Sequence, residues 1–139
     1  MKKIILFIML VIMTLCTSCN SETPIKTIKY NDIYDYANIN IKSIDVKFDN
    51  EYIGEFEITD NQLIENIYNL ILDSNYNYKD PIPPTGNIKL TIKYNNGDNV
   101  LISSGHIVYN DNPYFCTNKL EIDALLINYA LENKLVTVR

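Results

Sequence analysis

Apolar and polar residues alternate along two parts of the chain, and this pattern limits the fold more than any other feature. In the first part, Ile44, Val46 and Phe48 alternate with charged residues. Residues 52–58 repeat the alternation after the polar stretch Asp49-Asn50-Glu51. Successive side chains of a β-strand point to opposite faces of the sheet. The period of two therefore predicts an antiparallel hairpin with one face on a core and the other in water.

A second hairpin is predicted over residues 88–103. Residues 88–94 alternate apolar and polar positions, Asn96-Gly97 follows as a strong turn dipeptide, and residues 100–103 return. Shorter strands are predicted at 106–109 and 114–116, because Asn110-Asp111-Asn112-Pro113 supplies another turn between them. Residues 135–138 are predicted to add a terminal strand.

Two segments have the apolar spacing of helices. Thr59 and Gln62 have the spacing of a capping box, and the apolar residues that follow lie on one face of a predicted helix of about fourteen residues. Asn118 is placed to cap a second helix, with Glu121 three residues further on. Apolar residues between positions 120 and 131 occupy more than one face of this second helix, which we therefore expect to be the more buried of the two.

This order of elements predicts an α+β fold. We expect an antiparallel sheet of about five or six strands with two helices packed on one face, in the order ββα-ββββα. The sequence divides into a leader at 1–18, a polar tether at 19–39 and a single domain at 40–139. Between the first helix and the second hairpin, residues 73–86 contain three prolines and a glycine, which predicts a long connector.

The first nineteen residues have the layout of an export signal. Lys2 and Lys3 are followed by the apolar run 4–13 and then by small and polar residues up to Cys19. Because a transmembrane helix needs about 20 apolar residues, this run is too short to span a membrane.

The stretch at 16–19, Cys-Thr-Ser-Cys, resembles the lipobox of bacterial lipoproteins, with Thr17 and Ser18 at the two small positions. Cys16 stands where that family usually has Leu, Val or Ile. The resemblance implies removal of residues 1–18, a diacylglyceryl thioether on Cys19, and a protein that is lipid-anchored on the extracytoplasmic side of the cell membrane. The alternatives are an ordinary signal peptide cut near Ser18 and an uncleaved anchor. A redox or metal-binding Cys-x-x-C pair is disfavoured, because such pairs lie on folded scaffolds.

Composition narrows the possible partners. Loss of Lys2 and Lys3 would make the net charge of −5 more negative by two. No basic stretch then remains that could follow a phosphate backbone, so nucleic-acid binding is disfavoured.

With Cys19 lipidated, Cys116 would have no intramolecular disulfide partner. The abundance of Ile, Asn, Lys and Tyr is typical of AT-rich genomes. In this respect the mature chain weakly resembles small uncharacterised lipoproteins of low-GC Gram-positive bacteria.

The predicted connector is the strongest candidate for a binding element. Tyr76, Tyr78, Pro81, Pro83 and Pro84 form a stiff, partly apolar segment, and long loops in small domains often bind ligands. The alternative is a structural cover over a sheet edge.

No catalytic, metal or cofactor site is predicted. Ser103 and Ser104 lie near His106, the single histidine, but no nucleophile motif surrounds them. Asp45, Asp49, Glu55 and Glu57 have the pattern of a solvated strand face, and the Asn- and Asp-rich turns lack the glutamate of a calcium loop. The sequence therefore predicts a membrane-anchored, non-catalytic domain that binds an envelope protein or a small ligand, with a cell-envelope hydrolase as the alternative.

Overall fold

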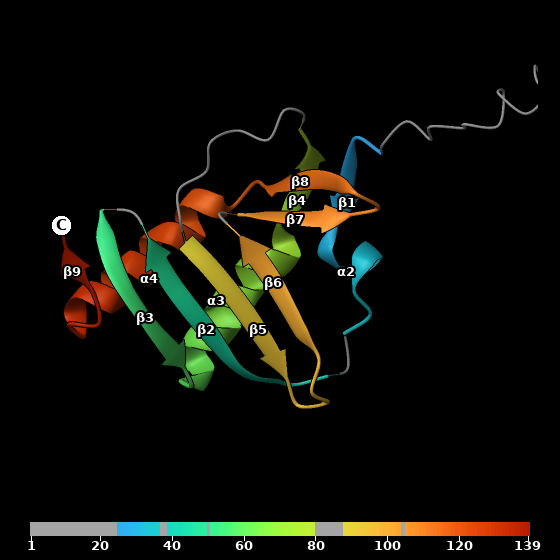
Figure 1. Cartoon of the computed structure of the whole chain (residues 1–139). Coiled ribbons are helices and arrows are strands. Elements are labelled where there is room, and N and C mark those ends of the chain that lie inside the picture. The colour runs from blue at the N-terminus through green and yellow to red at the C-terminus, as the bar shows by residue number, and fades with distance from the viewer. Residues whose placement is uncertain (1–24, 37–38, 50, 80–87, 104) are drawn as a thin grey trace, which may run out of the picture.

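The structure is a computed structural model that describes residues 25–36, 39–49, 51–79, 88–103 and 105–139. These residues form one antiparallel sheet, with two longer helices behind part of it and a single helical turn beside it (Figure 1). In chain order the elements are β1 (Thr27–Lys29), α2 (Tyr30–Ile33), β2 (Ile41–Asp49), β3 (Tyr52–Ile58), α3 (Asn61–Asp73), β4 (Asn75–Tyr78), β5 (Ile88–Tyr94), β6 (Asn99–Ser103), β7 (His106–Tyr109), β8 (Asn112–Cys116), α4 (Lys119–Glu132) and β9 (Thr137–Val138).

Both hairpins predicted from the alternating residues are present. β2 pairs with β3 and also with β5, so that Val46 lies opposite Phe56 on one side and Leu90 on the other. β5 pairs in turn with β6 across the predicted turn, where Gly97 has a φ of +93°. The apolar residues of β2 and β5 are buried and face the helices, as their period of two requires.

The predicted fold class was wrong. The described residues contain nine strands in the order β1-β4-β8-β7-β6-β5-β2-β3-β9 and three helices, in place of an α+β fold with five or six strands and two helices. The missed strands, β1 and β4, have three and four residues, and each buries only one side chain completely. Such short segments show no alternation long enough to recognise, and distant pairing stabilises them.

Part of the predicted tether belongs to the fold. Within the stretch assigned to a polar tether at 19–39, residues 27–33 form β1 and α2. Ile28 and Tyr30 are buried in the core, and the Tyr30 hydroxyl lies 2.8 Å from the Tyr94 hydroxyl of β5. The polar character of this segment comes from neighbouring residues such as Lys29, Asn31 and Asp32, which are exposed to water.

The predicted connector also contributes a strand. β4 lies between β1 and β8, with Tyr76 paired to both Ile28 and Cys116. Residues 80–86 of the connector lie outside the described residues.

The helices α3 and α4 lie on the same side of β2, β3 and β5 (Figure 1). α3 begins at Asp60, whose side chain caps the helix by accepting a hydrogen bond from the Leu63 backbone N–H at 2.7 Å. The prediction of a capping box formed by Thr59 and Gln62 was therefore wrong. α3 and α4 bury three residues each, so the prediction that α4 would be the more buried helix was wrong as well. Asn118 precedes α4 as expected but donates to the Leu70 carbonyl at 3.1 Å and forms no side-chain cap. No helix in the described part of the chain has the length and apolar content needed to cross a membrane.

The sheet changes direction between β6 and β7. These strands share one register pair, Ser103 with His106, and β7 and β8 then run across the direction of β5 and β6 (Figure 1). This bend brings β8, β4 and β1 around the end of α3, where Tyr30 and Tyr76 meet it.

Candidate binding groove

An open groove of about 530 Å³ lies between α3 and the segment that leads into β2. We call it the Tyr36–Tyr68 groove. It combines two aromatic rings, amide side chains, one carboxylate and a few aliphatic side chains. Among the described residues its lining consists of Tyr36, Ile39, Asn40, Ile41, Asn61, Ile64, Glu65, Tyr68 and Asn95.

The two tyrosines of the groove belong to a cluster that holds their rings in place. Tyr36 stacks on Tyr94, with ring centroids 4.1 Å apart. Tyr68 meets both Tyr30 and Tyr94 edge to face, and its hydroxyl lies 3.5 Å from that of Tyr94. Aromatic pairs in these arrangements add stability beyond their buried area. The groove wall is therefore built on the core and does not need a ligand to order it.

The phenols of Tyr30, Tyr36 and Tyr94 stay neutral at physiological pH. Burial raises the pKa of Tyr94 above its ordinary value, and its hydrogen bonds with Tyr30 and Tyr68 raise it further. Burial also raises the pKa of Tyr30, while its hydrogen bond with Tyr94 opposes that rise. Loss of solvation and the charge of Asp98 raise the pKa of Tyr36. Of these three tyrosines, Tyr36 lines the groove and can exchange hydrogen bonds with a ligand, but its neutral phenol is a poor proton acceptor.

The rim of the groove is made of exposed amides. A 2.9 Å hydrogen bond from the Asn95 backbone N–H to the Asn40 backbone carbonyl oxygen holds these two residues beside each other. Asn61 and Glu65 come from the first turns of α3. Each amide side chain offers both donors and an acceptor. Because the described lining has no cationic side chain and has the carboxylate of Glu65, it favours a neutral polar molecule over an anion.

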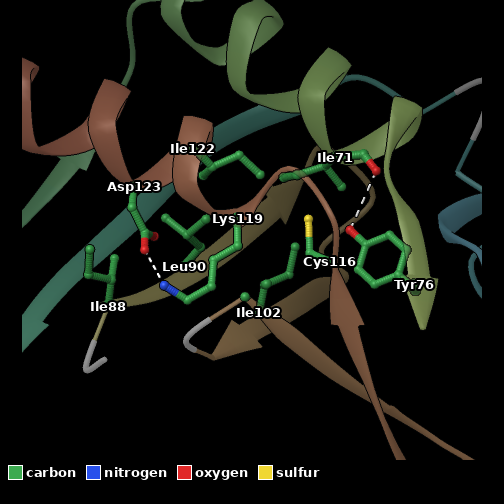
Figure 2. A pocket seen from close by; sticks show the side chains of 10 residues that line it. Ile71, Tyr76, Ile88, Leu90, Ile102, Cys116, Lys119, Ile122 and Asp123 are labelled. Atoms are coloured by element: carbon green, nitrogen blue, oxygen red, sulfur yellow. Dashed lines mark hydrogen bonds and ion pairs between the residues drawn. The ribbon is translucent and has the colours of Figure 1, made fainter. Parts of the chain in front are cut away.

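A second, enclosed cavity is too small for a ligand. Its volume is about 10 Å³, close to the minimum for one water molecule. Figure 2 shows Lys119 reaching over this cavity to pair with Asp123, above a floor of aliphatic side chains. Gly105 is required here, because a Cβ atom on it would lie 2.5 Å from the Lys119 side chain. This cavity is a packing gap in the core.

The residues of the predicted binding loop do not form one described segment: Tyr76 and Tyr78 lie in β4, and the three prolines lie outside the described residues. Tyr76 is fully buried, and its hydroxyl lies 3.4 Å from the Ile71 carbonyl oxygen, as Figure 2 shows, so it supports the core. Tyr78 is half-buried in β4 beside Tyr114, with ring centroids 6.0 Å apart. Pro81, Pro83 and Pro84 lie outside the described residues, as does Cys19, the predicted lipid attachment residue.

Ser103 and His106 form no catalytic pair, and Ser104 lies outside the described residues. His106 packs on Phe115 with ring centroids 5.4 Å apart, and its Nδ1 atom is buried with no hydrogen-bond partner in the described structure. Burial lowers the pKa of His106, and a hydrogen bond to the Ser103 backbone partly opposes this effect. A serine nucleophile needs its hydroxyl bonded to an imidazole nitrogen, and Ser103 provides only its backbone.

The carboxylates of the first hairpin are joined in ion pairs on the open face of the sheet. Lys93 Nζ lies 2.7 Å from Asp45 and 3.3 Å from Glu57, and Ser43 donates to Glu57 at 2.6 Å. The hydrogen bond from Ser43, followed by the contact with Lys93, lowers the pKa of Glu57. Asp49 and Glu55 are paired with Arg139 and Lys47 at 3.8 and 3.4 Å. In the described parts of the chain, no group of His, Cys, Asp or Glu residues could hold a metal ion.

The groove residues were missed by sequence reasoning. They come from three separate segments, around 36–41, 61–68 and 95, and none of these segments carries a recognisable motif. The available signal was the spacing of Asn61, Glu65 and Tyr68, which places them along one side of α3. No protein-family model matches the chain, and no curated protein or solved structure is significantly similar to it.

Proposed function

We propose that this protein is a non-catalytic binding domain, held on the extracytoplasmic side of the cell membrane by a lipid on Cys19, and that the Tyr36–Tyr68 groove receives its ligand. The anchor rests on the lipobox-like leader. The binding function rests on one observation, the open groove of about 530 Å³ with an aromatic wall and an amide rim.

The groove fits a small ligand in size and chemistry. Small-molecule sites commonly have volumes of about 300 to 1,000 Å³ and combine apolar walls with a few polar groups that fix orientation. Here Tyr36 and Tyr68 offer ring surface, and Asn40, Asn61 and Asn95 offer hydrogen bonds in both directions. A neutral polar ligand, such as an oligosaccharide or a segment of peptide, suits this set.

Amide NMR of the labelled protein tests the groove. On titration with chitotriose, and separately with a capped tripeptide, we expect the amides of residues 39–41, 61–68 and 95 to shift with at least one of the two probes. Asn61→Ala should weaken that binding about 2- to 10-fold, which is the effect of losing one neutral hydrogen bond. The matched control is Gln62→Ala, a change of the neighbouring exposed residue, which does not line the groove. Shifts confined to other surfaces, or equal effects of the two variants, would remove the groove from the proposal.

Metabolic labelling with a palmitate analogue tests the anchor. Wild-type protein should carry the label and remain with the membrane fraction, whereas Cys19→Ala should carry none, because the thioether requires that sulfur. Equal labelling of both proteins would contradict attachment at Cys19.

A further inference from the structure

β6 has one edge that the sheet leaves open along most of its length. On one side, every residue of β6 pairs with β5. On the other side, β6 shares a single register pair with β7, Ser103 with His106, and β7 then runs across the direction of β6 (Figure 1). Within the described part of the chain, residues 99–102 therefore have a strand neighbour on one side only.

The hydrogen bonds of the β5–β6 hairpin decide which backbone groups lie on this open edge. The Tyr94 N–H donates to the Asp98 carbonyl oxygen at 2.9 Å. Because hydrogen-bonded pairs alternate along an antiparallel ladder, the next residues that exchange backbone hydrogen bonds with β5 are Val100 and Ile102. The backbone groups of the residues between them point to the open edge.

Asn99 and Leu101 therefore direct their N–H and C=O groups away from β5. The pairing of Ser103 with β7 agrees with this alternation, since Ser103 lies two residues beyond Leu101. Among the described residues, no hydrogen bond engages the outward backbone groups of Asn99 and Leu101. β6 also has no charged residue and no proline, which are the usual means of keeping another strand away from an open edge.

A groove of about 280 Å³ lies at this edge, and we call it the β6–β7 groove. Its described lining combines residues of β6 and β7 with Tyr34. Leu101 and Val108, which are 57% and 59% exposed, place apolar side chains beside it. This lining has no acidic, lysine or arginine side chain, and burial lowers the pKa of His106 within it. The β6–β7 groove therefore favours an uncharged occupant.

We propose that the β6–β7 groove binds an extended, uncharged segment of a partner protein, which adds to the sheet as a further strand along β6. Outward N–H and C=O groups that recur every second residue match the backbone of an extended peptide. The added strand would lie about 4.8 Å from β6. Its side chains would alternate between the face of Leu101 and the face of the helices.

A second copy of this chain fits the β6–β7 groove less well than a single peptide strand. Each described strand already has a neighbour in its own sheet. A second copy would therefore bring more than one strand into a space that β7 and Tyr34 border. No described lining residue is shared with the Tyr36–Tyr68 groove, so either proposal can fail without the other.

Hydrogen exchange of the labelled full-length protein, followed by amide NMR, tests whether the edge is open. In the free protein, the amide of Leu101 should exchange at least about tenfold faster than those of Val100 and Ile102, which are bonded to β5. Equally slow exchange of all three amides would overturn the proposal, because it would show that a second copy or another part of the chain already pairs with β6.

A short β-forming peptide tests strand addition. The probe is acetyl-Thr-Val-Thr-Val-Thr-amide at about 5 mM, a concentration that detects the millimolar Kd expected of a few hydrogen bonds. It should shift the amides of residues 99–103 and 106–108 and slow the exchange of the Leu101 amide about tenfold. The matched control is the same peptide with every residue N-methylated. It has no backbone donors and should do neither.

A proline variant tests the role of the outward donor. Leu101→Pro removes only an N–H that points to the open edge, where a strand tolerates proline, and should weaken peptide binding about tenfold or more. Leu101→Val keeps the N–H and an apolar side chain and should bind within about threefold of the wild type. Circular dichroism reports whether both variants fold. The N-methylated peptide tests the same hydrogen bonds on the unaltered protein.

Three outcomes of the peptide experiments would remove strand addition. The first is binding of the N-methylated peptide as tight as that of the parent peptide. The second is equal binding by folded Leu101→Pro and Leu101→Val. The third is a set of shifts confined to residues 39–41, 61–68 and 95, which would place the peptide in the Tyr36–Tyr68 groove instead.

Discussion

At the scale of single residues, a pair of buried hydroxyl groups joins α2 to β5 in the interior of the sheet. Tyr30 of α2 and Tyr94 of β5 are both almost completely buried, and their hydroxyl oxygens lie 2.8 Å apart. A buried hydroxyl without a partner costs more than its hydrogen bond contributes, because it has lost its water. Each of the two buried hydroxyl groups therefore depends on the other for its hydrogen bond.

Replacing Tyr94 by phenylalanine should lower the free energy of unfolding by about 1–3 kcal/mol, because the Tyr30 hydroxyl then remains buried without its partner. Tyr30→Phe should cost less, since Tyr94 keeps its contact with Tyr68. The double variant should lose less than the sum of the single losses. Urea unfolding followed by circular dichroism measures all three values. Additivity within about 0.5 kcal/mol would show that the two hydroxyls are not coupled.

At the scale of elements, β4 shows how a short polar strand is stabilised. Asn75 and Asn77 face water while Tyr76 points into the core between α3 and β8. The Asn75 amide donates to the Thr117 hydroxyl at 3.1 Å, and Asn77 accepts from Thr27 at 2.9 Å. The strand thus combines one deeply buried ring with polar contacts at its edges.

Tyr76→Ala should destabilise the protein by about 3–5 kcal/mol, as truncation of a buried aromatic side chain does. Asn75→Ala is the matched control, because its side chain is exposed and its backbone bond to Thr117 remains; it should change stability by less than about 0.5 kcal/mol. Thermal or urea unfolding provides the comparison. A loss below about 1 kcal/mol for Tyr76→Ala would mean that β4 is a loosely attached loop.

At the scale of the whole molecule, the two ends of the described chain form the two edges of the sheet. β1 and β9 have three and two residues, and such short edges offer little surface for pairing with other chains. The described fold also begins at β1, well before the predicted domain start at residue 40. If Cys19 carries the lipid, the chain from Cys19 to Thr27 reaches at most about 29 Å, which keeps the domain close to the membrane.

Three buried tyrosines, Tyr30, Tyr76 and Tyr94, limit the stability of the protein at alkaline pH. Burial raises the pKa of Tyr30, Tyr76 and Tyr94 in the folded state above the ordinary value of about 10. At a pH between the pKa of the unfolded state and the higher pKa of the folded state, the unfolded chain releases phenol protons that the folded protein retains. The stability that these three tyrosines contribute is therefore complete below pH ~10 and is lost as the pH rises further.

Absorbance at 295 nm should accordingly reach the full amplitude of 11 tyrosinates only when circular dichroism shows unfolding. Tyr94→Phe should reduce the delayed part of the signal. Complete ionisation near pH ~10 with native circular dichroism would contradict the burial of Tyr30, Tyr76 and Tyr94.

The strands with long alternation and the two longer helices could be predicted from the sequence. The hairpins β2–β3 and β5–β6 follow from residues such as Val46 and Leu90, whose pattern requires one wet face and one dry face. α3 follows from the spacing of Ile64, Ile67 and Ile71. These elements are local, so their signal lies within a single stretch of chain.

The positions of β1, β4 and the Tyr36–Tyr68 groove, by contrast, depend on contacts between distant parts of the chain. Tyr30 and Tyr76 lie in short polar stretches, and what buries them is a set of partners as distant as Tyr94 and Cys116. Asn61 and Asn95 meet at the groove for the same reason. A local pattern shows which face of an element is apolar. Pairing between distant segments depends instead on the order in which the strands assemble into the sheet.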